Sequence, residues 1–178
     1  MNNKLEITRN NSVLKLCKDI DLNVDILYIG AHPERFQLVN MFKEKGAKLD
    51  LLEIFKPNVD YFLNEKTKIF NNIILGDIRN IDKLIDREYD GVVWWHGPEH
   101  ITKNELKDTL MKLENITTKW VIIGCPWGIY KQDEVYGNIY EKHLNYIYPN
   151  DLESLGYICN TIGQVDKIGS NISSIKIL

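Results

Sequence analysis

Residues 25–30 of this 178-residue chain have the sequence DILYIG, and this segment decides the fold class. Asp25–Ile29 contains four consecutive apolar side chains, and Gly30 follows directly. A short apolar run that stops at a turn residue is typical of a strand buried on both faces, as in a parallel sheet. Glycine after such a strand allows a sharp turn and a close approach of the backbone to a ligand. The segment therefore predicts a buried strand with a candidate binding loop at its end.

Similar apolar runs and amphipathic segments alternate along the rest of the chain. Alternation of this kind predicts βαβ units with right-handed crossovers and a parallel sheet covered by helices. We therefore expect an α/β fold, Rossmann-like and doubly wound, with a mostly parallel seven-stranded sheet and an antiparallel C-terminal hairpin. The further strands are expected at 49–53, 72–75, 91–95 and 120–124, the hairpin at 157–163 and 171–178, and the helices at 34–45, 57–64, 81–87, 103–115 and 149–155.

Length and composition indicate one globular domain. A chain of 178 residues is close to the usual size of a domain, and its 44% hydrophobic and 26% charged residues are ordinary for a packed protein. We expect a single domain over 1–178, with a helix or arm over 1–22 and a Rossmann-like core over 25–178. The first segment is expected to pack near the ligand-binding end of the sheet.

Charge, hydropathy and cysteine usage limit the partners. The net charge is -3, from 22 basic and 25 acidic residues, and no basic stripe stands out, so nucleic acid is not favoured as a partner. No segment approaches the ~20 apolar residues of a membrane span. The three cysteines are widely spaced and form no CxxC motif, which favours reduced thiols and a cytoplasmic location. The sequence is compatible with a homodimer.

The loops after the first three strands contain candidate binding residues. In open α/β sheets, ligands bind outside the carboxyl ends of the strands. Glu53 ends the second expected strand, 23 residues after Gly30, which is near the ~20 expected for an acid that binds ribose hydroxyls. Asp77 follows the third strand and can accept the amino group of an adenine, with Ile78 as an apolar wall. The alternatives are a solvated acid at a strand end for Glu53 and a simple Gly-Asp turn for Asp77.

The loop after the fourth strand contains two histidines in the segment 94–101, WWHGPEHI. His96 to His100 also matches H-x-x-E-H, a pattern found in zinc proteases. That mechanism needs both histidines on one helix, and Gly97 and Pro98 interrupt the required helix. We therefore expect no metal there. Imidazole titrates near neutral pH, which suits a general base, although a capping or structural role is the alternative.

Four segments together resemble the class I S-adenosylmethionine-dependent methyltransferases. ILYIG stands in the place of the glycine-rich first motif of that family, and LLEIF resembles the acid-bearing second motif. ILGDI resembles the third motif, and YDGVVWWHGPEHI resembles the fourth, in which a strand led by Asp runs into an EHL-like helix start. Residues 136–157 are similar to the stretch after strand five in small members. The likeness extends over about 25–163.

The resemblance implies S-adenosylmethionine as cofactor and assigns roles to the loops. Gly30 and its neighbour His32 would contact the methionine part, Glu53 with Ile54 the ribose, and Asp77 with Ile78 the adenine. His96 is a candidate both for contact with the cofactor and for deprotonating the acceptor. His100 and His143 are the next catalytic candidates.

One motif departs from the family pattern. The first motif usually has two or three glycines, whereas Ala31, His32 and Pro33 follow Gly30 here. Taken as a whole, the resemblance still implies an enzyme, which we expect to methylate a small-molecule or glycan-type acceptor. The alternative is a non-catalytic relative that has lost cofactor binding and acts as a partner or regulatory module. The long connection 129–148 is expected to form the acceptor-side wall.

Overall fold

The computed structural model describes residues 3–35, 37–64, 68–135 and 137–178. Within these residues, seven strands form one sheet in the order β3-β2-β1-β4-β5-β7-β6. Strands β1 to β5 are parallel, and β7 is antiparallel to both β5 and β6. This confirms the expected fold class, including the C-terminal hairpin. The strands are β1 (Asp25–Ile29), β2 (Lys48–Glu53), β3 (Ile73–Leu75), β4 (Tyr89–Trp95), β5 (Thr117–Cys125), β6 (Ile158–Ile162) and β7 (Asn171–Ile177).

The helices follow the expected segments with three corrections, one of which is that the helix expected at 149–155 ends at Glu153. The helix expected at 34–45 extends only over Gln37–Glu44, because the Arg35 amide donates to the His32 carbonyl at 3.0 Å and closes a turn; residue 36 lies outside the described residues. The helix expected at 81–87 ends at Leu84, since Ile85 is extended and buried in the core. The helices are α1 (Asn3–Leu16), α2 (Gln37–Glu44), α3 (Lys56–Asn64), α4 (Ile81–Leu84), α5 (Lys103–Asn115) and α6 (Pro149–Glu153), with 3₁₀ turns η1 (Ile78–Asn80), η2 (Pro98–His100) and η3 (Ile139–Glu141).

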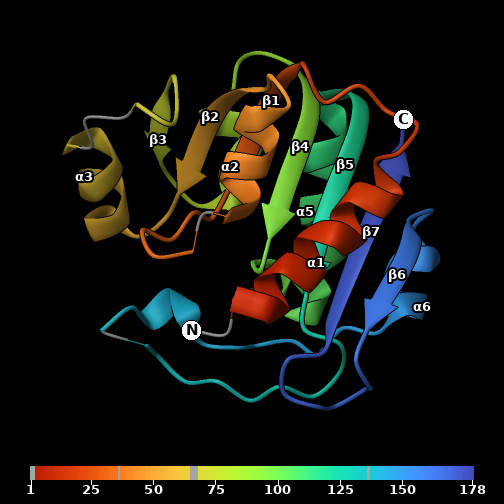
Figure 1. Cartoon of the computed structure of the whole chain (residues 1–178). Coiled ribbons are helices and arrows are strands. Elements are labelled where there is room, and N and C mark those ends of the chain that lie inside the picture. Colours follow the sequence, from red (N-terminus) through yellow and green to blue (C-terminus); the bar gives the residue numbers. More distant parts are fainter. Residues whose placement is uncertain (1–2, 36, 65–67, 136) are drawn as a thin grey trace.

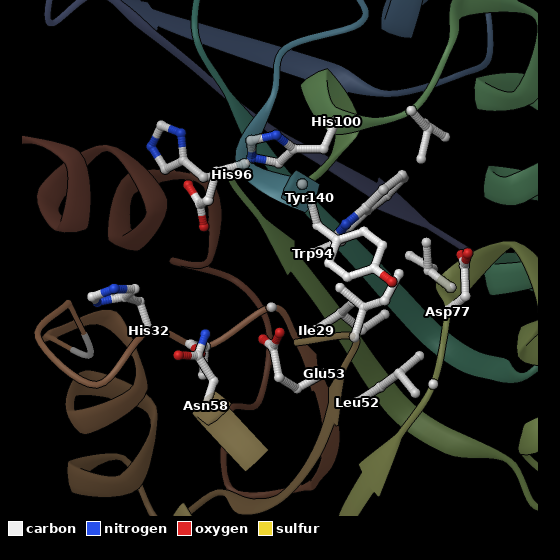
Figure 2. Close-up of a pocket in the computed structure, with 18 of the residues that line it drawn as sticks. Ile29, His32, Leu52, Glu53, Asn58, Asp77, Trp94, His96, His100 and Tyr140 are labelled. Carbon is white, nitrogen blue, oxygen red and sulfur yellow. The ribbon is translucent and has the colours of Figure 1, made fainter. Parts of the chain in front are cut away.

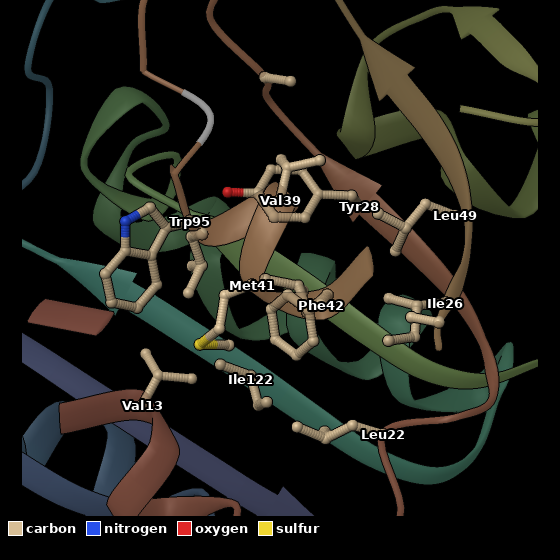
Figure 3. Close-up of a cluster of buried hydrophobic side chains, with 14 of the residues drawn as sticks. Val13, Leu22, Ile26, Tyr28, Val39, Met41, Phe42, Leu49, Trp95 and Ile122 are labelled. Atoms are coloured by element: carbon tan, nitrogen blue, oxygen red, sulfur yellow. The ribbon is translucent and has the colours of Figure 1, made fainter. Parts of the chain in front are cut away.

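Two hydrophobic layers sandwich the sheet. On one face, side chains of α1, α2 and α3 pack on alternate residues of the central strands, such as Ile26, Tyr28 and Ile122 (Figure 3). On the other face, α4, α5 and α6 cover the intervening residues, among them Leu27 and Val92. The continuous apolar runs are therefore explained by burial on both faces.

On β4 and β5, each of two tryptophans pairs with a glycine of the neighbouring strand. Gly91 of β4 pairs with Trp120 of β5, and Trp95 of β4 pairs with Gly124 of β5. A Cβ atom at either glycine would collide with the indole of its partner. Trp94 and Trp95 lie on opposite faces, as a strand requires. The absence of a side chain at the two glycines thus makes room for two buried indoles.

The carboxyl ends of the parallel strands meet the long connection between β5 and α6. The arrowheads of β2 and β4 point toward this connection, which runs along the bottom of Figure 1. Helix α1 lies across the face near β7 and β6, and the Asn160 side-chain amide donates to the Ser12 hydroxyl at 2.9 Å. No helix in the described part of the chain is both long and apolar enough to span a bilayer.

Candidate functional site

A cavity opens at the carboxyl ends of β1, β2 and β4. Its lining includes each of the seven residues that the sequence assigned to cofactor binding, and His100 as well. Glu53 lies between His32 and Asp77 in the view of Figure 2, with Tyr140 in front of the apolar floor made by Ile29 and Leu52. The seven residues are Gly30, His32, Glu53, Ile54, Asp77, Ile78 and His96.

Glu53 is a buried acid at the centre of this cavity. Its side chain is at the end of β2, and Oε1 accepts a hydrogen bond from the Phe55 amide at 2.7 Å. Burial raises the pKa of Glu53 to about 7, and the negative charge of Glu141 adds to this effect. Hydrogen bonds from Phe55, Ile54 and Asn58 act in the opposite direction. A carboxylate that remains largely desolvated can gain free energy by accepting hydrogen bonds from a ligand.

Asp77 is held in place by Arg79. The Arg79 side chain donates to both oxygens of Asp77, at 2.6 to 3.0 Å, and the Arg79 amide donates to Oδ1 at 2.9 Å. Burial opposes ionisation of Asp77, but the bonds from Arg79 outweigh it and lower the pKa of the carboxyl. Arg79 also contacts Glu105 on α5. The acid therefore faces the cavity as a carboxylate whose acceptor sites are already engaged.

The first loop has the backbone geometry of a ligand loop despite its single glycine. Gly30 has a φ of +78°, and apart from its two chain neighbours no heavy atom of the described residues lies within 4 Å of the position that a Cβ would occupy. The Glu34 amide donates to Nδ1 of His32 at 3.1 Å, so the next residues form a tight turn before α2 begins. The Asn58 side chain donates to the Ala31 carbonyl at 3.4 Å and ties the loop to α3. The open space beside Gly30 is therefore available to a ligand.

A second cavity of about 330 Å³ adjoins the first. The long connection contributes Tyr130, Gln132 and His143, and α1 contributes Glu6 and Arg9. Volumes above ~300 Å³ are usual for small-molecule pockets. The residues that line both cavities mark their junction: Gly30, His32, His96, His100 and Glu141.

Half-buried His96 and buried Glu99 form a pair at this junction. Nδ1 of His96 donates to Oε1 of Glu99 at 3.1 Å, and His96 has a φ of +52°, a backbone region that β-carbon-bearing residues rarely adopt. Nε2 of His96 is buried and has no hydrogen-bond partner among the described residues. Since Nδ1 is the protonated nitrogen in a neutral ring, Nε2 is the one that can accept a proton.

Glu99 also faces the two other histidines. Its carboxylate and a ring nitrogen from each of His100 and His143 lie within 4.8 Å of one another. The backbone explains this meeting, because the carbonyl of Glu99 accepts hydrogen bonds from the amides of Leu144 and Asn145 at 2.8 and 3.1 Å. Burial opposes ionisation of Glu99, but the bond from His96 and the nearby charges of His100 and His143 prevail and lower its pKa.

The structure adds two residues that the sequence did not indicate, Asn58 and Arg79, and it brings two residues of the long connection, Tyr140 and Glu141, into the first cavity. Asn58 and Arg79 follow the second and third motifs closely, but no pattern marks them as ligand-facing. Tyr140 and Glu141 belong to η3, whose place depends on how the long connection folds back. The described part of this connection does provide a wall of both cavities.

Comparisons with known proteins agree on the fold. No family model and no curated protein sequence matches the chain. Among solved structures, a complex of DhpI with SAH superposes with a TM-score of 0.69 at 12% identity, over 98% of this chain and 86% of that one. Magnesium protoporphyrin IX methyltransferase (ChlM) from Synechocystis PCC 6803 with bound SAM gives 0.62 at 14% identity, over 96% and 79%. The N-terminal domain of EvdMO1, in the presence of SAH and D-fucose, gives 0.65 at 13% identity, over 99% and 84%.

These likenesses define the class of fold. The mostly parallel seven-stranded sheet with its antiparallel β7 matches the class I methyltransferase fold of these neighbours. The resemblance inferred from the four motifs is thereby confirmed for the fold.

Proposed function

We propose that this chain is a methyltransferase that uses S-adenosylmethionine as its methyl donor. The observation that supports this most strongly is the junction of the two cavities, where His96 lies between a pocket containing Glu53 and Asp77 and a pocket of small-molecule size. An extended cofactor could place its methionine part near Gly30 and His32, its ribose at Glu53 and its adenine near Asp77. This order follows the arrangement of these side chains in Figure 2.

Each contact has a chemical reason. The buried Glu53 carboxylate can accept two hydrogen bonds from the ribose diol. The open space beside Gly30 allows close approach of the methionine part. Ile78 and Ile29 provide apolar surface for the adenine, and Asp77 is positioned to accept its amino group. S-adenosylmethionine supplies an electrophilic methyl group on a sulfonium.

The role we propose for His96 is to accept the acceptor's proton. S-adenosylmethionine would supply the methyl group to the acceptor oxygen and leave as S-adenosylhomocysteine, and Nε2 of His96 would take up the proton that the acceptor hydroxyl loses. Glu99 fixes the ring through Nδ1, as the orienting acid does in other general-base pairs. Positioning at the junction would supply much of the acceleration.

The second cavity favours a small polar acceptor. Both charge signs face it, from Glu6 and Arg9 on α1 and from Arg35, and Gln132 and Ser170 add neutral polar groups. Such a lining suits an acceptor with several hydroxyls, as in a sugar. D-fucose in the EvdMO1 structure is an independent reason to favour a glycan-type acceptor over other small molecules.

Calorimetry with S-adenosylhomocysteine tests the proposal. We expect micromolar binding by the full chain, loss of binding in Glu53→Ala, and unchanged binding in the control Asp60→Ala, whose carboxylate pairs with Lys56 on the surface of α3. Absence of binding up to millimolar concentration would reject the enzyme and favour the non-catalytic alternative.

A second measurement examines His96. With S-adenosylmethionine and a panel of sugars as substrates, the His96→Ala variant should form S-adenosylhomocysteine far more slowly than the wild type. Its affinity for the cofactor should equal that of the wild type. General-base catalysis contributes typically 10²–10⁴-fold, so a loss in that range is expected. Undiminished turnover in the variant would remove His96 from the proposed role.

A further inference from the structure

We infer that Glu99, His100 and His143 form a binding site for one divalent first-row transition-metal ion. A donor atom of each side chain lies within 4.8 Å of the other two. Two imidazoles and one carboxylate are a donor set suited to such ions, with Zn²⁺ as the redox-inert representative, whereas Mg²⁺ and Ca²⁺ prefer oxygen ligands alone.

The hydrogen bonds of the two histidines engage one ring nitrogen of each, Nδ1, and leave Nε2 without such a bond to the described residues. Nδ1 of His100 donates to the Lys142 carbonyl at 3.2 Å, and Nδ1 of His143 donates to the Tyr130 carbonyl at 2.6 Å. A carbonyl can only accept, so Nδ1 is protonated in both rings, and in the neutral form of each ring Nε2 has the lone pair. Metal-binding histidines usually make this bond from the other ring nitrogen to a carbonyl or carboxylate, which fixes both tautomer and orientation.

Glu99 provides the independent second observation. Its side chain is 3% exposed, and Oε2 is buried without a hydrogen-bond partner among the described residues. Leaving a buried carboxylate oxygen unpaired costs considerable free energy. Oε1 is already occupied by Nδ1 of His96, so the unpaired oxygen is the one available to a cation. A metal ion would satisfy it.

This site differs from the zinc-protease pattern in the same segment. The H-x-x-E-H pattern would use His96 and His100 from one helix, but only Pro98–His100 is helical here, as a single 3₁₀ turn. His143, brought in by the connection between β5 and α6, takes the place that the pattern gives to His96. Three protein ligands leave coordination positions open. Because His100 and His143 line the second cavity, the ion could hold an acceptor oxygen there, and this role alone rests on the proposed methyl transfer.

Cobalt(II) titration of the untagged, chelator-treated full chain tests the site directly. We expect visible d–d absorption that saturates at one ion per chain, is displaced by Zn²⁺ and is unaffected by excess Mg²⁺. His143→Ala and Glu99→Gln should each weaken binding by more than the roughly 10–100-fold typical of losing an outer partner of a ligand. His32→Ala, which removes one of the two histidines outside the cluster, should bind cobalt like the wild type.

The outcomes separate this site from the proposed function. Circular dichroism and S-adenosylhomocysteine calorimetry on each variant report the fold and the cofactor pocket independently of the metal. Absence of cobalt absorption at millimolar ion, or equal binding by His143→Ala, would overturn the metal site and leave the cluster as a hydrogen-bond network. Cobalt binding without binding of S-adenosylhomocysteine would support the metal site and reject the cofactor proposal.

Discussion

The indole of Trp95 covers Gly124, its pairing partner on the neighbouring strand β5. Trp95 also lines the second cavity, so the same contact connects the core to the candidate site. A Cβ atom at residue 124 would overlap the Trp95 ring, so the indole or the strand would have to shift.

Gly124→Ala should therefore destabilise the protein. Overpacking a well-filled core typically costs 1–3 kcal/mol, and we expect a loss of about that size in the free energy of unfolding, measured with urea. The double variant with Trp95→Leu should lose less than the sum of the single variants, since the clash is then relieved. A Gly124→Ala protein as stable as the wild type would show that the indole can move at no cost.

Glu53 should make stability depend on pH. Burial raises its pKa to about 7 from the ordinary 4.5, so the folded state retains a proton that the unfolded chain loses between these values. The contribution is complete below pH 4.5 and is lost as pH rises through 7. Glu53→Gln should consequently be more stable than the wild type above pH 7, by on the order of 1–3 kcal/mol, in urea unfolding. Equal stability of the two at pH 8 would contradict the buried-acid interpretation.

Cofactor affinity should have the opposite pH dependence. The ionised Glu53 accepts ribose hydroxyls, so the wild type should bind S-adenosylhomocysteine more tightly at pH 8 than at pH 6, by at most about tenfold per pH unit below the pKa. Glu53→Gln should bind weakly and without this dependence.

Glu141 and His32 also face this cavity, so Glu141→Gln is the informative comparison: removing its charge lowers the pKa of Glu53 and should shift the transition to lower pH. Calorimetry across the pH range measures both.

The ion pair between Asp77 and Arg79 predicts that Arg79 competes with the adenine amino group for the Asp77 carboxylate. Arg79 occupies both oxygens of Asp77, so an adenine amino group must displace part of this contact. Asp77→Ala should weaken binding of S-adenosylhomocysteine about tenfold, in line with a lost hydrogen bond to a charged group. Arg79→Ala should bind it as tightly as the wild type or more tightly, and should lose at most ~1 kcal/mol of stability because the ion pair is largely exposed. Equal losses of affinity in both variants would instead assign the contact to Arg79.

Tyr140 provides the fourth test of the cofactor pocket. Its ring lies in front of the apolar floor of the first cavity, and it is 42% exposed (Figure 2). If an adenosine binds beneath this ring, Tyr140→Ala should weaken the binding of S-adenosylhomocysteine by a few-fold to about tenfold. The reason is that an aromatic contact contributes ~0.5–1.5 kcal/mol. Tyr140→Phe should restore the affinity. Unchanged binding in the alanine variant would mean that η3 does not cover the cofactor.

The fold was predictable because its signals are local. Each buried strand requires an apolar run and each connection a turn residue, and both are visible in segments such as Asp25–Ile29 and Gly30. The acids at the strand ends were predictable for the same reason, since parallel strands bring their carboxyl ends to one edge. Helix lengths were less predictable: Ile85 leaves its helix to bury its side chain, a tertiary effect that helical periodicity does not record.

The histidine cluster was only partly predictable. His96, His100 and His143 were candidates individually, yet the sequence placed no constraint on their distances. His143 reaches Glu99 because two backbone amides beyond it, those of Leu144 and Asn145, bond to the Glu99 carbonyl. Such contacts between residues more than 40 positions apart depend on the course of a loop without regular structure. The engagement of Asp77 by Arg79 was missed because any neighbouring arginine could equally have pointed to solvent.

The position of α1 has a consequence for synthesis on the ribosome. Helix α1 ends at Leu16, whereas the strands it packs against, β6 and β7, begin only at Ile158 and Asn171. The helix also provides Glu6 and Arg9 to the second cavity. At translation rates of ~5–20 residues per second, this helix waits roughly ten seconds or more before its partners exist. The polypeptide can therefore assemble its early parallel strands during elongation, but this wall of the second cavity is completed only once β6 and β7 have been synthesised and have joined the sheet.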